Sequence, residues 1–461
     1  MLKRVFIPNR GEIAVRVIRA CRELGITSVL GYSEADRESL AAMIADEKIC
    51  IGAAAPLESY LNIPAILSAM EVTRADSVHP GYGFLSENPF FIEVCNASRL
   101  VFIGPGPEQV RLMGDKSEAR KIVRKNRLPV IPGVDSLIDI KDAVKQAKKI
   151  GFPVMIKASA GGGGRGMRIA RTVDDFVAFW PACQQEAKNA FDNPSLYIEK
   201  FIERPRHIEI QVLGDHYGDI LVFPERDCSL QRRHQKLIEE SPSPAVDFSV
   251  RKRLQKIAKK ICKVIGYNSV GTIEFLMGAK HPYFMEMNTR IQVEHPITEM
   301  ITGFDLVKAQ IEVASGEKIR FSPSVVPFTG HSIECRINAE DPERDFLPCP
   351  GKITHLVLPG GPGIRVDTHI YQGYIIPPYY DSLLAKVISY GRDRQEAISR
   401  MQRALEEMKI EGVSTTINFY KKVLEHPVFQ SGRYYVGWLE KILSGMKDRQ
   451  SSVLLHRGTN G

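Results

Sequence analysis

Eight cysteines are scattered through the 461 residues, and no two of them form a C-x-x-C pair. Isolated cysteines are typical of reduced, mostly buried thiols rather than of a disulfide framework or a zinc site. The chain also has no hydrophobic run long enough for a secretory signal or a membrane span. We therefore expect no disulfide, no zinc and no membrane partner, and we expect a cytoplasmic protein.

Basic runs interleaved with aromatic residues, which a nucleic-acid groove needs, are missing too. The net charge of +8 results from 62 lysines and arginines against 54 acids, an excess that suits small anionic ligands. The longest basic run, Arg251 to Arg253, is predicted to lie on a solvated helix face. We expect no nucleic-acid partner.

Two common phosphate-binding loops are absent. The loop after the first apolar run, Pro8 to Glu12, lacks the G-x-G-x-x-G of dinucleotide sites, and no G-x-x-x-x-G-K-[ST] loop occurs. What the first hundred residues do contain is an alternation of apolar runs and helical patterns. This alternation predicts a parallel sheet covered on both faces, in a Rossmann-like N-terminal unit. The strand-like runs are 5–7, 28–30, 77–78 and 100–103.

The rest of the chain divides into further segments. Residues 115–205 combine helices, turns and a glycine run, and they could move as a lid. Residues 270–290 and 331–390 are rich in strand-like runs, whereas 395–409 has the spacing of an amphipathic helix. With 44% hydrophobic residues, the composition is that of a globular protein, and the length of 461 residues favours two or three units. The alternation of strands and helices makes the expected fold class α/β.

A glycine run indicates a nucleotide site. A predicted strand that contains Lys157 is followed at once by Gly161 to Gly166 and then by another apolar run. Glycines let backbone N–H groups approach phosphate oxygens, and a nearby lysine adds positive charge. A flexible linker is the alternative, but a linker does not explain the two flanking strands. Some forty residues on, the segment Glu199, Lys200, Phe201 and Ile202 could read an adenine edge.

Two acids in a predicted hairpin indicate a metal site. Pairing about Lys280 would place Glu274 opposite Glu286, with Asn288 on the same face because side chains alternate along a strand. Oxygen ligands without histidine or cysteine suit Mg²⁺ or Mn²⁺ bound together with phosphates. The alternative is a pair of solvated acids on an edge strand.

A polar cluster follows directly. Arg290, Gln292 and Glu294 recur at period two, so a continuing strand would place all three on one face. A guanidinium can bind a small oxyanion such as bicarbonate, and a carboxylate can take its proton. A second basic cluster, Gln231 to Lys236, could equally be an exposed helix start, and His207 is expected as a polar residue at the head of a strand.

Taken together, these segments resemble the biotin carboxylases of the ATP-grasp superfamily over residues 2–440. The segments that carry the resemblance are Asn9 to Ala14, His79 to Asn88, Gly161 to Gly166, Gln231 to Lys236 and Glu286 to Pro296. Two positions differ from what is common there: Ala160 replaces a glycine and Ile202 a leucine. Neither change threatens the chemistry.

The resemblance implies three domains and a tail. They are an N-terminal domain at 1–114, an ATP-grasp domain at 115–330 with a lid at about 131–204, a β-rich C-terminal domain at 331–440 and a polar tail at 441–461.

The resemblance also implies roles for single residues. The residues that would contact ATP are Lys116, Lys157, Gly163, Gly164, Glu199, Lys200, Phe201, Ile202, His207, His234, Glu274 and Glu286. Metal ligands would be Glu274, Glu286 and Asn288. Bicarbonate would meet Lys236, Arg290, Gln292 and Val293, with Glu294 as its base. Arg336 would meet the biotin ureido oxygen, and Tyr82 would line the biotin pocket.

The implied activity is ATP-dependent carboxylation of biotin by bicarbonate. Nothing in the chain resembles a biotin carrier or carboxyltransferase domain, so these partners are expected as separate chains, and a homodimer is expected. Acetyl-CoA, as in fatty acid biosynthesis, is the first expectation for the final acceptor and pyruvate the second. Another ATP-grasp ligase and a non-catalytic nucleotide-binding subunit remain the alternatives.

Overall fold

A computed structural model describes residues 2–158, 167–191, 194–279, 281–319, 321 and 324–443. Within it the chain forms two compact units. Unit 1 contains the chain up to Ala119, Arg206–Phe275 and the chain from Glu286 onward, and unit 2 contains Arg120–Pro205 and Leu276–Met285. No helix in the described ranges is both long and apolar enough to cross a bilayer.

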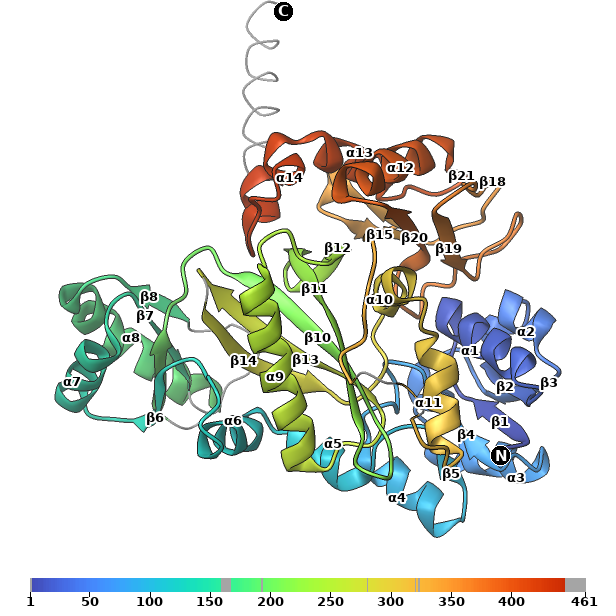
Figure 1. The fold of residues 1–461 in the computed structure, drawn as a ribbon, viewed down its shortest axis with the longest axis horizontal. Coiled ribbons are helices and arrows are strands. Elements are labelled where there is room, and N and C mark those ends of the chain that lie inside the picture. Colours follow the sequence, from blue (N-terminus) through green and yellow to red (C-terminus); the bar gives the residue numbers. More distant parts are fainter. Residues whose placement is uncertain are drawn as a thin grey trace, which may run out of the picture. The chain divides into compact units, whose positions relative to one another are not determined.

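Unit 1 begins with a five-stranded parallel sheet in the order β3-β2-β1-β4-β5 (Figure 1). Helices connect the strands, and the buried stripe of the first helix, with Ile13, Val17 and Cys21, packs into the core. The Rossmann-like prediction is confirmed. The strands are β1 (Arg4–Ile7), β2 (Thr27–Ser33), β3 (Glu47–Gly52), β4 (Ser77–Val78) and β5 (Val101–Phe102). The helices are α1 (Gly11–Glu23), α2 (Leu40–Ile44), α3 (Ile63–Val72), α4 (Pro89–Ala97) and α5 (Pro107–Gly114).

An eight-stranded sheet follows in the order β14-β13-β10-β11-β12-β15-β20-β19. The pairs β10–β11, β11–β12, β12–β15, β15–β20 and β19–β20 are antiparallel. The strands are β10 (Arg206–Gly214), β11 (Ile220–Arg232), β12 (Gln235–Ser241), β13 (Val270–Gly278), β14 (His281–Asn288), β15 (His331–Asn338), β19 (Ile364–Thr368) and β20 (Leu383–Gly391). Helices α9 (Phe248–Ile265), α10 (His295–Thr302) and α11 (Leu306–Ala314) complete this part.

Helix α9 contains the basic run that was expected on a solvated face. Asp247 caps its first turn by accepting from the Ser249 and Val250 amides, and Gly266 ends it in the left-handed conformation. Lys252 and Arg253 are exposed as predicted. Arg251 is not, because its guanidinium turns inward to the buried carboxylate of Glu225 at 2.6 Å.

The C-terminal helices cover one face of β15 and β20. Side chains alternate along these strands, so Ile333, Cys335 and Val387 pack into an apolar core with Met401 and Tyr420. The opposite face is therefore left for polar side chains. The helices are α12 (Arg394–Glu407), α13 (Ile417–Glu425) and α14 (Pro427–Gln430). Short strand pairs are β16 (Glu340–Asp341) with β17 (Leu347–Pro348) and β18 (His355–Val357) with β21 (Lys409–Glu411).

Unit 2 contains a four-stranded antiparallel sheet in the order β6-β9-β7-β8. Phe176 and Trp180 of α8 pack against Ile156 and Ile198 of this sheet. The strands are β6 (Gly133–Leu137), β7 (Val154–Ala158), β8 (Arg168–Ala170) and β9 (Leu196–Lys200), and the helices are α7 (Ile140–Ile150) and α8 (Val173–Phe191). Helix α6 (Lys116–Lys125) precedes them in the chain.

Candidate active site

Lys236 is the centre of a buried ionic cluster in unit 1. Its Nζ lies 2.8 Å from Glu294 Oε1, 3.1 Å from Glu274 Oε1 and 3.1 Å from Gln292 Oε1, and it also donates to Glu209. These partners lie on β10, on β13 and in the loop after β14. Lys236, on β12, is the cation that they share. A single ammonium group thus neutralises carboxylates that would otherwise repel one another.

The cluster fixes the charge of its members. Burial alone would lower the pKa of Lys236, but the charges of Glu209 and Glu274 raise it well above the usual value of lysine. Burial alone would raise the pKa of Glu294, but Lys236 opposes this effect and the net shift is downward. Glu294 is therefore ionised at neutral pH, as a general base must be.

Two members of the cluster were not among the predicted residues. Arg226 is fully buried and donates from Nε and Nη2 to Glu209 Oε2 at 3.1 and 3.0 Å. The sequence does hold a signal for Glu209, because His207, Glu209 and Gln211 alternate with apolar residues in β10. Such a row of polar side chains on one face of a buried strand indicates a polar site.

The hairpin predicted for the metal residues is confirmed, because β13 and β14 are neighbours in the sheet. Asn288 Nδ2 donates to Glu274 Oε1 at 2.7 Å, and Lys116 Nζ lies 2.6 Å from Glu286 Oε2. The pKa of Glu274 is well below its usual value because Lys236 and His207 outweigh the effect of burial. An ionised carboxylate beside an amide, with a second carboxylate two residues from that amide, is a hard oxygen set that fits Mg²⁺ or Mn²⁺.

His207 lies against this set. Its Nε2 is 2.9 Å from Glu274 Oε2 and 3.3 Å from Glu209 Oε1. Burial alone would lower the pKa of His207, but Glu274 and Glu209 raise it to about 10. The imidazolium is therefore a cation that pairs with both carboxylates. Among the described residues, two groups bring three potential ligand atoms within 4.8 Å: His207, Glu209 and Glu274, and Glu209, Cys228 and Glu294.

The loop after β14 departs from the prediction. The strand ends at Asn288, so Arg290, Gln292 and Glu294 do not share a strand face. The reason is Glu87, whose carboxylate accepts from the Thr289 amide at 2.8 Å and from Arg290 Nε at 2.8 Å, in place of a neighbouring strand. Gln292 and Glu294 still converge on Lys236, whereas Arg290 turns toward Glu87 and Asn288.

The segment Gln231 to Lys236 does not begin a helix, which was one of its two interpretations. It is the turn of the β11–β12 hairpin, with Arg233 and His234 in the left-handed region at φ +48° and +66°. His234 is exposed at this turn, and Lys236 points into the ionic cluster.

Of the two residues predicted for biotin, Arg336 contacts Glu294 and Tyr82 contacts Glu12. Arg336 on β15 donates from Nη2 to Glu294 Oε2 at 3.0 Å and from Nε to Glu239 Oε1 at 2.7 Å. Tyr82 donates to Glu12 and lines a cavity of about 310 Å³ together with Arg10, Phe84, Tyr380 and Asp381.

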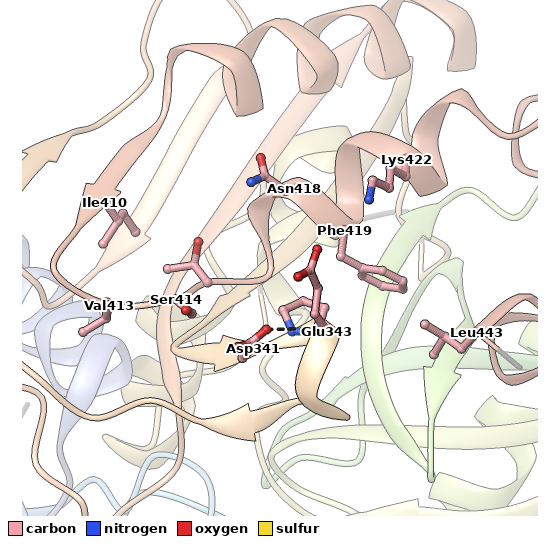
Figure 2. A pocket seen from close by; sticks show the side chains of 11 residues that line it. Asp341, Glu343, Ile410, Val413, Ser414, Asn418, Phe419, Lys422 and Leu443 are labelled. Carbon is pink, nitrogen blue, oxygen red and sulfur yellow. Dashed lines mark hydrogen bonds between the residues drawn. The ribbon is translucent and has the colours of Figure 1, made fainter. Parts of the chain in front are cut away.

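Lys386 connects these residues to the loop. Its ammonium group is fully buried on β20, where it donates to the Val293 carbonyl at 2.8 Å and lies 3.0 Å from Glu12 Oε1. One cation therefore contacts both the predicted bicarbonate segment and the carboxylate that holds Tyr82. A second cavity, of about 460 Å³, is lined by Asp341, Glu343, Asn418 and Lys422 among others and contains none of the predicted residues (Figure 2).

Unit 2 contains the predicted nucleotide residues between Lys157 and Ile202, whereas Lys116, His207, His234, Glu274 and Glu286 belong to unit 1. Lys157 on β7 pairs with Glu199 on β9, and Lys200 donates to the carbonyls of Gly151 and Phe152 at 3.0 and 2.9 Å. Phe201 and Ile202 directly follow β9. The strands β7 and β8 flank the glycine run, as predicted, but Gly163 and Gly164 lie outside the described residues.

Three family models match the chain in succession. The biotin carboxylase N-terminal domain matches residues 1–110, the carbamoyl-phosphate synthase L chain ATP-binding domain 115–321 and the biotin carboxylase C-terminal domain 334–441. The chain belongs to the biotin carboxylase family. Biotin carboxylase 1 of Bacillus subtilis (strain 168) is 53% identical over 443 residues, which are 95% of this chain and 98% of that protein. A pyruvate carboxylase subunit from Methanothermobacter thermautotrophicus is 51% identical over 455 residues, 98% of this chain and 93% of that protein.

Solved biotin carboxylases have the same fold. The Campylobacter jejuni biotin carboxylase in a βγ-ATP complex matches with a TM-score of 0.88 and 47% identity, over 96% of this chain and 99% of that one. The biotin carboxylase domain dimer of Hydrogenobacter thermophilus 2-oxoglutarate carboxylase, in complex with MgADP, ADP and bicarbonate, matches with a TM-score of 0.86 and 47% identity, over 96% and 98%.

Proposed function

We propose that this chain carboxylates biotin with bicarbonate at the expense of ATP, and that the cluster around Glu294 is where the carboxyl group is activated and transferred. The observation that carries the proposal is the position of Glu294, whose two oxygens accept from Lys236 and Arg336. An ionised base between the predicted bicarbonate and biotin residues is what a reaction joining these two substrates needs.

ATP would be held by the residues that the family resemblance indicates. They are Lys116, Lys157, Gly163, Gly164, Glu199, Lys200, Phe201, Ile202, His207, His234, Glu274 and Glu286. Glu274, Glu286 and Asn288 would hold Mg²⁺ or Mn²⁺, which supplies positive charge against the phosphate oxygens when bound. The lysines and His207 would add to that charge.

In the first step, bicarbonate attacks the γ-phosphate, giving carboxyphosphate and ADP. Lys236, Arg290, Gln292 and Val293 would hold the bicarbonate, and Glu294 would take its proton. The contacts of Lys236 suit this role, because its ammonium group donates to both Gln292 and Glu294.

In the second step, carboxyphosphate breaks down to CO₂ and phosphate, and biotin N1 attacks the CO₂. The released phosphate would take the N1 proton, and the guanidinium of Arg336 would stabilise the negative charge on the ureido oxygen. Carboxyphosphate hydrolyses in water, so we also propose that a lid at about 131–204 excludes solvent during the reaction.

The biotin would be carried by a separate carrier protein, and a separate carboxyltransferase would use the product. We propose three domains at 1–114, 115–330 and 331–440, and a homodimer. The biotin carboxylase and pyruvate carboxylase relatives are both about 50% identical to this chain, so sequence identity does not separate the two acceptors. Acetyl-CoA therefore stays the first proposal for the acceptor, and pyruvate the second.

The test is ATP hydrolysis by the purified chain with Mg²⁺, with bicarbonate and free biotin added singly and together. A rise that requires both substrates supports the proposal. Hydrolysis that bicarbonate stimulates and biotin does not would favour another ATP-grasp ligase, and nucleotide binding without turnover would favour a regulatory subunit.

A further inference from the structure

Two carboxyl groups face one another in the β12–β15 pair. Glu239 and Glu334 are direct cross-strand partners, and both side chains are fully buried. Like charges opposite one another destabilise a sheet unless a cation or a proton removes one of them. The pair therefore requires an explanation that the proposed reaction does not by itself provide.

Only one of the two carboxyls has a cation bound to it. Glu239 Oε1 accepts from Arg336 Nε at 2.7 Å, whereas neither oxygen of Glu334 has a hydrogen-bond partner within the described part of the chain. Lys386 on β20 is the cross-strand partner of Arg336, but its ammonium group contacts Glu12 and the Val293 carbonyl. A buried carboxyl without a cation is more stable as the neutral acid.

The charges around the pair agree with this assignment. Burial raises the pKa of both groups, but Arg336 limits the effect on Glu239, whose pKa is about 7. The pKa of Glu334 lies well above its usual value, since burial outweighs Lys386 and the neighbouring Glu239 charge adds to the shift. Glu239 is thus the counter-ion of the pair, and Glu334 is its neutral neighbour.

The contact with Glu239 restricts the orientation of the Arg336 guanidinium. A guanidinium is a planar fork, so binding Nε to Glu239 while Nη2 reaches Glu294 fixes the orientation of the whole group. Without the charge of Glu239, Glu294 would be the one carboxylate left to pair with Arg336. A stronger pairing would hold Glu294 ionised but make it a weaker base.

We propose that Glu239 is the positioning residue of Arg336: it carries the opposing charge that orients the guanidinium toward the biotin ureido oxygen and leaves Glu294 available to bicarbonate. Glu334 has no part in this role and contributes packing as a neutral acid. The inference rests on the proposed function, because it takes Arg336 as the biotin-binding arginine.

The test compares Glu239→Gln with Glu334→Gln, two substitutions of equal size that remove the same chemical group on opposite strands. For each we would measure biotin-dependent ATP hydrolysis, the KM for ATP and the midpoint of thermal unfolding. We expect Glu239→Gln to lower the biotin-dependent kcat about tenfold or more, with the KM for ATP within about twofold of the original chain. We expect Glu334→Gln to stay within about twofold in both, because a neutral amide replaces a neutral acid.

A pH profile gives a reading that a purely structural role would not change. The groups that face Glu239 are Arg336 and Glu334 on β15, Glu294 in the loop, Lys236 on its own strand and the thiol of Cys228 on β11. Since the ionised form of Glu239 orients Arg336, the biotin-dependent rate should rise with pH through about 7, and Glu239→Gln should lack this rise.

Equal losses in the two variants would overturn the inference, and so would a Glu239→Gln variant with the original rate and pH profile. If Glu239→Gln does not fold, Glu239→Asp replaces it: a retained rise near neutral pH with a reduced kcat supports the inference, and loss of the rise overturns it. Absence of biotin dependence in the unchanged chain would instead overturn the proposed function.

Discussion

Arg336 Nη2 lies 3.0 Å from Glu294 Oε2, while the other oxygen of Glu294 accepts from Lys236 at 2.8 Å. A single carboxylate thus lies between two cations that come from neighbouring strands, β12 and β15. This arrangement keeps Glu294 ionised despite its complete burial. It also makes the role of Glu294 open to direct tests.

Replacing Glu294 by glutamine should abolish most of the activity. An amide of the same shape cannot take the bicarbonate proton, so we expect bicarbonate-dependent ATP hydrolysis to fall by about 10² to 10⁴-fold. Steady-state kinetics would measure the loss, with the exposed substitution Glu411→Gln as the control. A rate within about tenfold of the original would contradict the role of Glu294 as base.

Lys236→Gln should destabilise the fold as well as impair catalysis. It leaves Glu209, Glu274 and Glu294 buried without their shared cation, which costs about 3–5 kcal/mol. The loss in free energy of unfolding should be larger at pH 8 than at pH 5, because the abandoned carboxylates can take up protons in acid. Urea unfolding at both pH values measures this loss, and Lys48→Gln, at an exposed position of β3, is the control. A loss that does not depend on pH would argue against charge repulsion as the cause.

Glu274→Gln should weaken metal binding. With one charged oxygen ligand fewer, we expect the Mn²⁺ concentration for half-maximal ATP hydrolysis to rise about tenfold or more, equivalent to about 1.4 kcal/mol. Chelation of the divalent ion should stop hydrolysis in the unchanged chain, and excess Mg²⁺ should restore it. The exposed substitution Glu343→Gln should leave the metal dependence unaltered. An unchanged Mn²⁺ requirement in Glu274→Gln would remove this residue from the proposed ligand set.

Glu240 should contribute pH-dependent stability away from the reaction. It accepts from Arg394 at 2.7 and 3.0 Å and lies 2.6 Å from His331 Nε2, and these partners hold its pKa below the usual 4.5 although burial opposes them. A lowered carboxyl pKa gives stability that is present above about pH 4.5 and is lost as the pH falls further.

Glu240→Gln should therefore lower the free energy of unfolding by about 3 kcal/mol at pH 7, and the difference should shrink below pH 4.5. Denaturant unfolding across this range measures the effect, with exposed Glu425→Gln as the control. If the stability difference between Glu240→Gln and the original chain grew in acid, it would contradict a lowered pKa of Glu240.

Local pattern was enough for the parallel sheet, for the β13–β14 hairpin and for the strands around the glycine run. In each case neighbouring residues determine the outcome, through alternation or through turn residues. The sequence could not show that Thr289 and Arg290 leave the strand, because the carboxylate that accepts from them belongs to Glu87, about two hundred residues earlier.

The surroundings of Glu239 and Glu240 could not be predicted from the sequence either. Glu239 and Glu240 are neighbours in β12 and look alike in the sequence, yet the pKa of Glu239 is raised and that of Glu240 is lowered. They point to opposite faces of the strand, so Arg336 approaches one and Arg394 the other. The partners only become known when β15 and α12 are placed against β12.

The discontinuous make-up of unit 1 has a consequence for its synthesis. Glu12 emerges from the ribosome near the beginning of the chain, whereas its cation partner Lys386 follows more than three hundred residues later. Until β20 has been made, the earlier part of the unit holds acids whose counter-charges do not yet exist. Nascent chains that end before residue 386 should accordingly not fold unit 1 completely, and they should aggregate unless chaperones bind them.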